Sequence, residues 1–431
     1  MIEAMESTET DVLIVGAGLT GCTLALALAN TSLDVMVLER GRPIRPPALN
    51  DPVCAGAALT GVVPGRIIAL NRQSLEALAR IGVPSESYPH FPFHRICAVD
   101  GCGSGRFSVA ASELGLDTLG SIVHADAPVA AMQAQLRDAS SVEIRFEAEV
   151  SSLDDAAEST SVTLSDGSCV DAKLVVAADG GQSTVRTMAG IQQLGWTYSQ
   201  QAIVCNAQCA LPHGCDASQV FLDTGPVALL PLSSGDQSLV SVVWSHNDAD
   251  ALCALTDDEF CAALTEATEA RYGEVIAVTP RLSFPLLQHQ ALGYVRKHLV
   301  LLGDAAHTIH PLAGQGANLG IADALTLAQE LGTCRYSGQL PGDIRLLRGY
   351  ERRRMPINVG VAALMEGFYR LFGSSHILPL WIRSRGMSEL ARVAGIRKLI
   401  GQLATGTWSF DQDELVRLRG DNLHSQDESD V

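Results

Sequence analysis

The chain has 431 residues and a formal net charge of −18, with 47% hydrophobic and 18% charged residues. This composition is typical of a folded protein of two or three domains and argues against a disordered chain. The strongly acidic balance argues against a general nucleic-acid binder.

The N-terminal residues lack the basic start of a signal or transit peptide. No uncharged apolar run reaches the length of a membrane span. We therefore expect a cytoplasmic protein that is either freely soluble or attached peripherally to the inner membrane.

The eleven cysteines are scattered, and none forms a Cys-x-x-Cys pair. Cys205, Cys209 and Cys215 form the one cluster, without a histidine at zinc-finger spacing. We expect buried thiols in a reducing compartment and no metal site.

The N-terminal segment reads as strand, glycine turn, helix and strand. The strands are predicted over residues 11–15 and 35–38, with the turn over 16–21 and the helix through 24–28. The second strand ends at Glu39 and Arg40. A glycine triplet in this context, with a terminal acid, is a dinucleotide-binding fingerprint.

Each residue of this fingerprint has a physical role. Gly16 makes the turn, Gly18 lets the backbone approach a pyrophosphate, and Gly21 allows the helix to pack on the strand. Glu39 is placed to bind ribose hydroxyls. The alternative is a packed βαβ unit with an empty turn, and the pattern does not distinguish FAD from NAD.

Residues 41–65 are rich in Pro, Gly and Ala, which predicts an irregular loop or flap. The segment 66–70 is predicted to open a helix that continues to Gly82. A cation at a helix start gains nothing from the helix dipole, so Arg66 is either functional or simply exposed.

The next segment combines strands with one helix. Residues 92–123 alternate apolar and polar side chains, which predicts strands of a second sheet. A helix is expected over 127–138, followed by strands over 143–147 and 161–164. An Asp-Gly turn at 166–167 then leads into another strand.

A buried strand over 174–178 ends at Asp179, Gly180 and Gly181, and Arg186 follows shortly after. The simplest interpretation is one more strand-to-helix turn.

Residues 190–290 are predicted to form mainly antiparallel sheet. The expected strands cover 202–210, 219–222, 227–232 and 239–244, and a helix with an acidic first turn covers 257–267. The apolar segment 225–232 is either plain sheet core or the wall of a pocket.

The segment 299–320 carries the strongest pattern. A buried strand over 299–302 ends at Gly303 and Asp304, and a Gly-rich loop then feeds a helix over 317–331. Such a helix start suits a phosphate or a delocalised anion. The alternative is a tight turn with a capping Asp.

The C-terminal region is locally basic. Between residues 335 and 398, twelve Arg and Lys residues stand against four acids. Residues 355–372 are apolar at helical spacing, and 376–382 place Trp381 among Ile, Leu and Pro. We favour a helix pair that closes the core over a basic face that contacts an anionic membrane. Residues 406–431 are expected to form a polar tail.

Three of these stretches resemble the signatures of one family. Gly-Asp-Ala-Ala-His (303–307) and His-Pro-Leu-Ala-Gly-Gln-Gly-Ala-Asn-Leu-Gly (310–320) resemble the second flavin-binding motif of the class A aromatic-ring flavoprotein monooxygenases. Ala-Asp-Gly-x-x-Ser-x-Val-Arg (178–186) is similar to their third motif, and the N-terminal fingerprint occupies the first position. The closest resemblance is to the ubiquinone-biosynthesis, or polyprenylphenol hydroxylase, branch.

The resemblance implies an α/β fold of the para-hydroxybenzoate-hydroxylase type. A Rossmann-like FAD-binding domain of the glutathione-reductase type carries an inserted, mainly antiparallel β-sheet substrate domain and C-terminal helices. The implied boundaries are 1–90, 124–190 and 290–334 for the FAD domain, 91–123 and 191–289 for the substrate domain, 335–405 for the helical region and 406–431 for the tail.

The resemblance also implies a flavin site. Asp304 would meet the ribityl chain, Arg66 the FAD phosphates, and the loop from Pro311 to Asn318 the isoalloxazine ring, with 225–232 flooring the substrate cavity. The implied cofactor-binding residues are Gly16, Gly18, Gly21, Glu39, Arg40, Arg66, Asp179, Gly180, Gly303, Asp304, Pro311, Gly314, Gln315, Gly316, Ala317 and Asn318.

No certain catalytic residue is implied, although His310 and Pro311 would lie near the flavin ring. A structural hydrogen bond is the favoured use of His310, and proton handling is the alternative.

The implied reaction is hydroxylation of a prenylated phenol by FAD, NAD(P)H and dioxygen through a C4a-hydroperoxyflavin. The reductant would bind transiently, or electrons would come from a protein donor. Two alternatives stay open: a flavin-dependent isoprenoid-chain reductase, and a non-catalytic flavoprotein of a quinone-biosynthesis complex. Contact with such a complex or with the membrane, and self-association into a homo-oligomer, are also left open.

Overall fold

The structure is a computed structural model that describes residues 7–45, 66–232, 237–311, 314–334, 338–372, 401–402 and 405–406. The expectations for residues 46–65, for Trp381 and for the tail after residue 406 lie outside the described residues.

The first sheet is built around five neighbouring strands that run parallel to one another. Its strands are β1 (Thr8–Val15), β2 (Val35–Glu39), β8 (Val142–Phe146), β9 (Val150–Asp155), β10 (Thr160–Leu164), β11 (Cys169–Ala177), β18 (Val295–Arg296) and β19 (Leu299–Leu301). The order is β18-β19-β11-β1-β2-β8, and β10 and β9 extend the sheet from β11. The central strands are continuous apolar runs because helices cover both faces of such a sheet.

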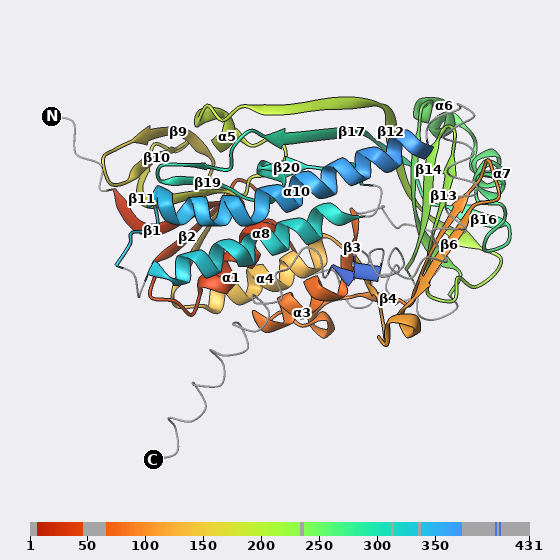
Figure 1. The fold of residues 1–431 in the computed structure, drawn as a ribbon, viewed down its shortest axis with the longest axis horizontal. Coiled ribbons are helices and arrows are strands. Elements are labelled where there is room, and N and C mark those ends of the chain that lie inside the picture. Colours follow the sequence, from red (N-terminus) through yellow and green to blue (C-terminus); the bar gives the residue numbers. More distant parts are fainter. Residues whose placement is uncertain are drawn as a thin grey trace, which may run out of the picture.

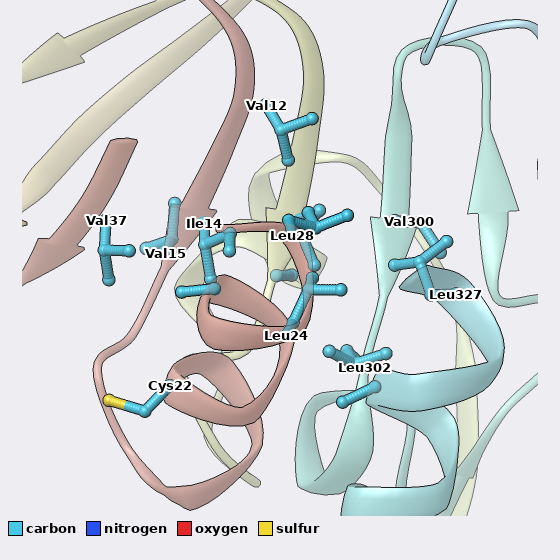
Figure 2. Packing of buried hydrophobic residues seen from close by; sticks show 14 of the residues in the cluster. Val12, Ile14, Val15, Cys22, Leu24, Leu28, Val37, Val300, Leu302 and Leu327 are labelled. Atoms are coloured by element: carbon cyan, nitrogen blue, oxygen red, sulfur yellow. The ribbon is translucent and has the colours of Figure 1, made fainter. Parts of the chain in front are cut away.

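The first sheet and the helices packed on it form the first lobe, also called the flavin lobe. Its main helices are α1 (Leu19–Leu28), α4 (Asp126–Asp138), α8 (Gln315–Gly332) and α10 (Ile344–Phe372). Figure 2 shows Leu24 and Leu28 of α1 beside the strand residue Ile14, and Leu327 of α8 beside Val300. All five side chains are fully buried and belong to one core. The helix predicted at 127–138 is confirmed.

The second sheet has nine strands and is antiparallel except where β13 runs parallel to β5. Its strands are β5 (Arg95–Asp100), β6 (Arg106–Ala110), β12 (Gln193–Cys209), β13 (Asp216–Leu222), β14 (Gly225–Pro231), β15 (Leu239–His246), β16 (Val275–Val278), β17 (Leu282–Ala291) and β20 (His307–Thr308). Two helices pack on it: α6 (Ala249–Ala254) through Ala249, and α7 (Asp257–Ala267) through Phe260 and Leu264.

The two sheets lie at opposite ends of the molecule, and three long elements extend between them (Figure 1). Strands β12 and β17 run along the top of the view, and α10 crosses in front. The predicted class, an α/β fold with an inserted antiparallel sheet and a C-terminal helix, is confirmed.

A third sheet of three strands corrects two expectations. It consists of β3 (Ile67–Asn71), β7 (Gly120–His124) and β4 (Phe91–Phe93), in that order. Residues 67–70 are therefore strand, not helix, because they pair with β7 along their whole length. The helix α3 (Arg72–Arg80) begins later, where the Asn71 side chain accepts a hydrogen bond from the Ser74 N–H.

The same sheet divides the segment 92–123, which was expected to join the second sheet as a whole. Strands β5 and β6 do so, whereas β7 pairs with β3 on one side and with β4 on the other. Pairing partners this distant in sequence leave no trace in the local alternation of side chains.

Helix α10 packs inward, in agreement with the favoured interpretation of the basic region. Tyr350 and Arg354 are fully buried, and Arg353 pairs with Glu330 of α8 at 3.2 Å. None of the described helices combines the length and the apolar character that crossing a bilayer requires.

Candidate functional site

Four strand ends lie side by side at one edge of the first sheet. The parallel register pairs Val15 of β1 with Leu38 of β2 and with Ala177 of β11, and it pairs Ala177 with Leu301 of β19. The residues singled out from the sequence follow these ends: Glu39, Gly16, Asp179 and Gly303. Ligands of open α/β sheets bind at this carboxyl edge.

The first glycine turn has one open position and two closed ones. Gly16 has φ +110°, and a Cβ atom there would collide with the Ala178 carbonyl. A Cβ atom at Gly21 would collide with the carbonyl of Gly16. A Cβ atom at Gly18, in contrast, would meet no atom within 4 Å. The turn therefore presents open space at the position where the fingerprint places a pyrophosphate.

The Glu39 carboxylate is held at the end of β2 by two backbone donors. Its Oε2 accepts a hydrogen bond from the Ala17 N–H and its Oε1 accepts one from the Gly41 N–H, both at 2.8 Å. Each carboxylate oxygen keeps a further lone pair for the hydroxyls of a ribose. Arg40, next along the chain, is exposed.

The second motif places opposite charges beside the turn. Asp304 follows Gly303, which has φ +56° and lies against Thr20 of α1. The Arg66 Nη2 atom lies 3.7 Å from Asp304 Oδ2, and the Arg66 side chain is 73% exposed. Arg66 precedes a strand rather than a helix, and it stands beside the same turn as Asp304.

Helix α8 begins close to this acid. Its N-cap is Gly314, in the left-handed conformation (φ 61°), and this residue offers no side-chain cap. The atom nearest to a Cβ placed at Gly316 is Asp304 Oδ1, at 3.9 Å. A helix start without a side-chain cap leaves backbone N–H groups of its first turn available to bind an anion. In α8 this first turn includes Gln315 and Ala317. Pro311 is exposed beside it.

Asn318 has a structural role in this helix start. Its Oδ1 accepts a hydrogen bond from the Asn71 N–H at 2.9 Å, and its Nδ2 donates to the carbonyls of Ala69 and Gly314. The side chain thus fixes the first turn of α8 against β3.

In the third motif, the carboxylate of Asp179 forms hydrogen bonds mainly within its own turn. Asp179 Oδ2 accepts hydrogen bonds from the Thr184 N–H at 2.8 Å and the Val185 N–H at 3.1 Å, and so caps the short helix α5 (Thr184–Met188). Asp179 Oδ1 is buried without a hydrogen-bond partner among the described residues. A Cβ at Gly180, where φ is +85°, would point into open space.

Arg186 joins the third motif to the second. This buried guanidinium donates to the Gly181 carbonyl at 3.0 Å and to the Ala305 carbonyl at 2.7 Å. His289 of β17 lies against the Asp304 carbonyl at 3.1 Å, and burial together with the nearby Arg186 lowers the pKa of this histidine. Arg186 is therefore a positioning residue for the turn that contains Asp304.

A buried charged cluster behind the second motif was not predicted. Asp323 of α8 lies 2.6 Å from His307 Nε2 and 2.6 Å from Arg354 Nε, and it accepts a hydrogen bond from Asn358 at 3.0 Å. Burial alone raises the pKa of Asp323, but Arg354 and His307 outweigh it and bring the pKa to about 2. The signal in the sequence was an acid, Asp323, that stands directly between apolar residues of the helix.

His310 lies in an aromatic environment between the two lobes. Its ring is 4.9 Å from Tyr198 of β12 and 5.3 Å from Tyr369 of α10, centroid to centroid. Burial lowers the pKa of His310 to about 4, so the imidazole is neutral. Neither ring nitrogen has a hydrogen-bond partner among the described residues. The favoured expectation of a structural hydrogen bond is therefore not met there.

These features together fit a flavin dinucleotide. The open face of Gly18 suits a pyrophosphate, the fixed Glu39 carboxylate suits ribose hydroxyls, and the uncapped start of α8 suits a ring that carries negative charge. Asp304 lies beside the third of these features, next to Gly316 of α8.

Two families of flavoprotein domains match the chain. Residues 60–364 match the family described as FAD binding domain, and residues 11–99 match the one described as FAD dependent oxidoreductase.

Curated relatives match over nearly the whole chain. Ubiquinone hydroxylase UbiL of Rhodospirillum rubrum is 34% identical, covering 95% of this chain and 92% of its own. The 3-demethoxyubiquinol 3-hydroxylase of Escherichia coli is 31% identical, covering 93% of this chain and 100% of its own. Human mitochondrial ubiquinone biosynthesis monooxygenase COQ6 is 29% identical, with 93% of each chain covered.

Solved structures share the fold at lower identity. The p-nitrophenol 4-monooxygenase PnpA of Pseudomonas putida DLL-E4 superposes with a TM-score of 0.75 at 20% identity, covering 94% of this chain and 100% of its own. PqsL of Pseudomonas aeruginosa, in complex with 2-aminobenzoylacetate, gives 0.70 at 21% identity, with 89% and 100% covered.

Proposed function

Because the chain belongs to the FAD-dependent aromatic-ring hydroxylases of ubiquinone biosynthesis, we propose that it inserts one oxygen atom from dioxygen into the ring of a prenylated phenol. The observation that carries this proposal is the register of the first sheet. It brings glycine turns and acids from three distant parts of the sequence to one edge.

FAD is the cofactor, and the chemistry it supplies when bound is the reduction of dioxygen and oxygen transfer to an electron-rich ring. The protein contributes binding and electrostatics. Glu39 and Gly18 would hold the adenosine and pyrophosphate portion, and Asp304 would hold the ribityl chain. The α8 dipole, which begins at Gly314, stabilises negative charge on the ring.

The second sheet supplies an apolar wall for the substrate. Along β14 the side chains alternate, so that Val227 and Leu229 pack beneath α7 while Ala228 and Leu230 lie on the opposite face. Leu230 packs with a cluster that includes residues of the third sheet, such as Phe93. An apolar surface of this kind suits a prenyl tail, which supports a lipid-tailed substrate.

NAD(P)H is proposed as a transient reductant because the sequence contains no second glycine-rich βαβ fingerprint. Peripheral contact with an anionic membrane would give access to a lipid-tailed substrate. Liposomes that contain acidic lipids would then retain the protein at low salt and release it at high salt. The charge-reversal variant should be the exposed Arg352, because Arg354 is buried and its reversal would disturb the fold.

The decisive experiment is turnover of the FAD-loaded protein with NAD(P)H, a prenylated phenol and ¹⁸O₂, followed by mass spectrometry. The hydroxylase gives a product that has gained one ¹⁸O atom. A product that has gained two hydrogen atoms would identify an isoprenoid-chain reductase instead. Absence of any turnover across prenylated phenols would refute the proposal in favour of a non-catalytic role.

A further inference from the structure

His310 occupies an unusual environment for a polar side chain. It lies two residues after β20 and directly before Pro311, and only 1% of its surface is exposed. Neither Nδ1 nor Nε2 has a hydrogen-bond partner among the described residues. His298, another buried histidine, has polar atoms close to its ring: the Lys173 carbonyl lies 2.9 Å from Nδ1 and the Ala157 carbonyl lies 3.4 Å from Nε2.

The walls around His310 are rigid and aromatic. The rings of His310 and Tyr198 meet edge to face, with an interplanar angle of 89°, and the rings of Tyr198 and Tyr369 are 4.7 Å apart. The Tyr198 hydroxyl lies 2.6 Å from Gln288 Oε1 and 2.6 Å from Glu366 Oε2. Because Tyr198 is engaged by these two side chains, its ring is fixed and its hydroxyl is already used.

Glu366, which is bound to the Tyr198 hydroxyl, is a charged group near His310, and apolar side chains lie beyond Tyr369. A buried cluster adjoins Tyr369 and includes Phe221, Ile309 and Met365. A buried polar group that loses its hydration without gaining a partner is unfavourable. The imidazole is neutral, so one nitrogen can accept a hydrogen bond and the other can donate one.

The position of His310 in the fold indicates which kind of molecule supplies its missing hydrogen-bond partner. His310 packs against Tyr198 of β12 and Tyr369 of α10. These two elements extend between the two sheets (Figure 1). Small-molecule sites occur preferentially at such junctions, with few polar groups among apolar walls.

We propose that the imidazole of His310 accepts a hydrogen bond from the ring hydroxyl of the aromatic substrate and makes the enzyme selective for phenols. This inference rests on the proposed function and names the side chain that recognises the substrate. The hydroxyl keeps its proton, and no bond is broken in this interaction. As the hydroxyl donates, its oxygen gives more electron density to the ring, which favours electrophilic attack ortho and para to it.

The test compares two ligands on the FAD-loaded protein. One is a short-chain prenylated phenol, and the other is the same ring with hydrogen in place of the hydroxyl. Dissociation constants are measured from the change in flavin absorbance. The wild-type protein is expected to prefer the phenol by about tenfold, the typical effect of one hydrogen bond to a buried group.

Two substitutions at His310 separate hydrogen bonding from ring shape. His310→Phe is expected to bind both ligands equally, whereas His310→Gln, which can still accept a hydrogen bond, is expected to retain a preference. If the Phe variant does not fold, His310→Leu takes its place. A matched control is His298→Gln, which alters a buried histidine of the first lobe and is expected to keep the wild-type preference.

Equal preference in wild type and His310→Phe would overturn the proposal. So would a variant that loses affinity for FAD but keeps the preference for the phenol, because that result assigns the imidazole to the coenzyme. A wild-type protein that shows the preference but transfers no oxygen would refute the hydroxylase function and leave the recognition role of His310 supported.

Discussion

Gly18 and Gly21 belong to the same turn, yet a methyl group has different consequences at the two positions. At Gly21 it would collide with the Gly16 carbonyl, so Gly21→Ala is expected to destabilise the fold. At Gly18 it would meet open space, and the backbone there (φ −79°) accepts alanine. Gly18→Ala should therefore keep the melting temperature of the apoprotein but weaken FAD binding by about tenfold or more.

Differential scanning fluorimetry of the apoprotein and a flavin fluorescence titration measure these two effects separately. Normal FAD affinity in Gly18→Ala would show that the pyrophosphate does not approach this turn.

The imidazole of His310 predicts a pH dependence of stability. Burial lowers its pKa from 6.5 to about 4, so between these values the unfolded chain takes up a proton that the folded protein does not. Folded stability is therefore complete above pH 6.5 and falls as the pH drops toward 4. Relative to His310→Phe, the wild-type protein should lose about 2 kcal/mol between pH 8 and pH 5.

Urea denaturation of both proteins at the two pH values gives this difference, and other titrating groups cancel in the comparison. A wild-type and variant pair with parallel pH profiles would mean that the imidazole titrates normally in the folded protein.

At the scale of elements, the contact between α8 and α10 depends on a buried ion pair. Asp323 and Arg354 are both fully buried, and their side chains lie 2.6 Å apart. Asp323→Asn leaves the guanidinium charge without its counter-ion, which is expected to cost about 3–5 kcal/mol of folding stability. The double variant Asp323→Asn/Arg354→Met should recover much of this loss because no unpaired charge remains.

Arg353→Met is the matched control on the same helix. Its partner Glu330 lies near the surface, and the loss is expected to stay below about 1 kcal/mol. Urea denaturation measures all three variants. Equal losses for Arg353→Met and Asp323→Asn would contradict the assigned importance of the buried pair.

Elements with local signals were predicted well. The helix α7 has the predicted bounds because Thr256 and Glu259 form a capping box at its start. The strand ends before Gly16, Asp179 and Gly303 were predicted because glycine at a turn and an acid after an apolar run encode backbone geometry locally.

Elements that depend on distant partners were not predicted. Residues 67–70 become strand only because β7, some fifty residues later, pairs with them. The importance of Asp323 requires knowledge of Arg354, which in the sequence counts only as one of many basic residues. The aromatic walls of His310 likewise come from β12 and α10, so their convergence is a property of the tertiary structure.

At the scale of the whole molecule, long elements connect the flavin lobe to the large sheet. Strand β12 has 17 residues, pairs with β17 over residues 193–197 and 201–204, and joins the rest of the sheet through β15 and β16. Helix α10 has 29 residues, packs on the first-lobe core at Tyr350 and reaches Tyr198 of β12 through Tyr369. The residues that we propose to face the substrate therefore depend on elements that both lobes stabilise.

This continuity predicts that the two lobes unfold in one transition. Buried thiols report on each lobe: Cys22 lies in the core of the first, and Cys205 and Cys209 lie in the core of the sheet. Burial raises the pKa of Cys205 to about 12 and of Cys209 to about 11, so these thiols react slowly in the folded protein. Pulsed alkylation along a urea gradient, with mass spectrometry of the peptides, should give one common midpoint. Alkylation of Cys205 and Cys209 at lower urea than Cys22 would show instead that the sheet opens independently, and that β12 and α10 do not couple it to the flavin lobe.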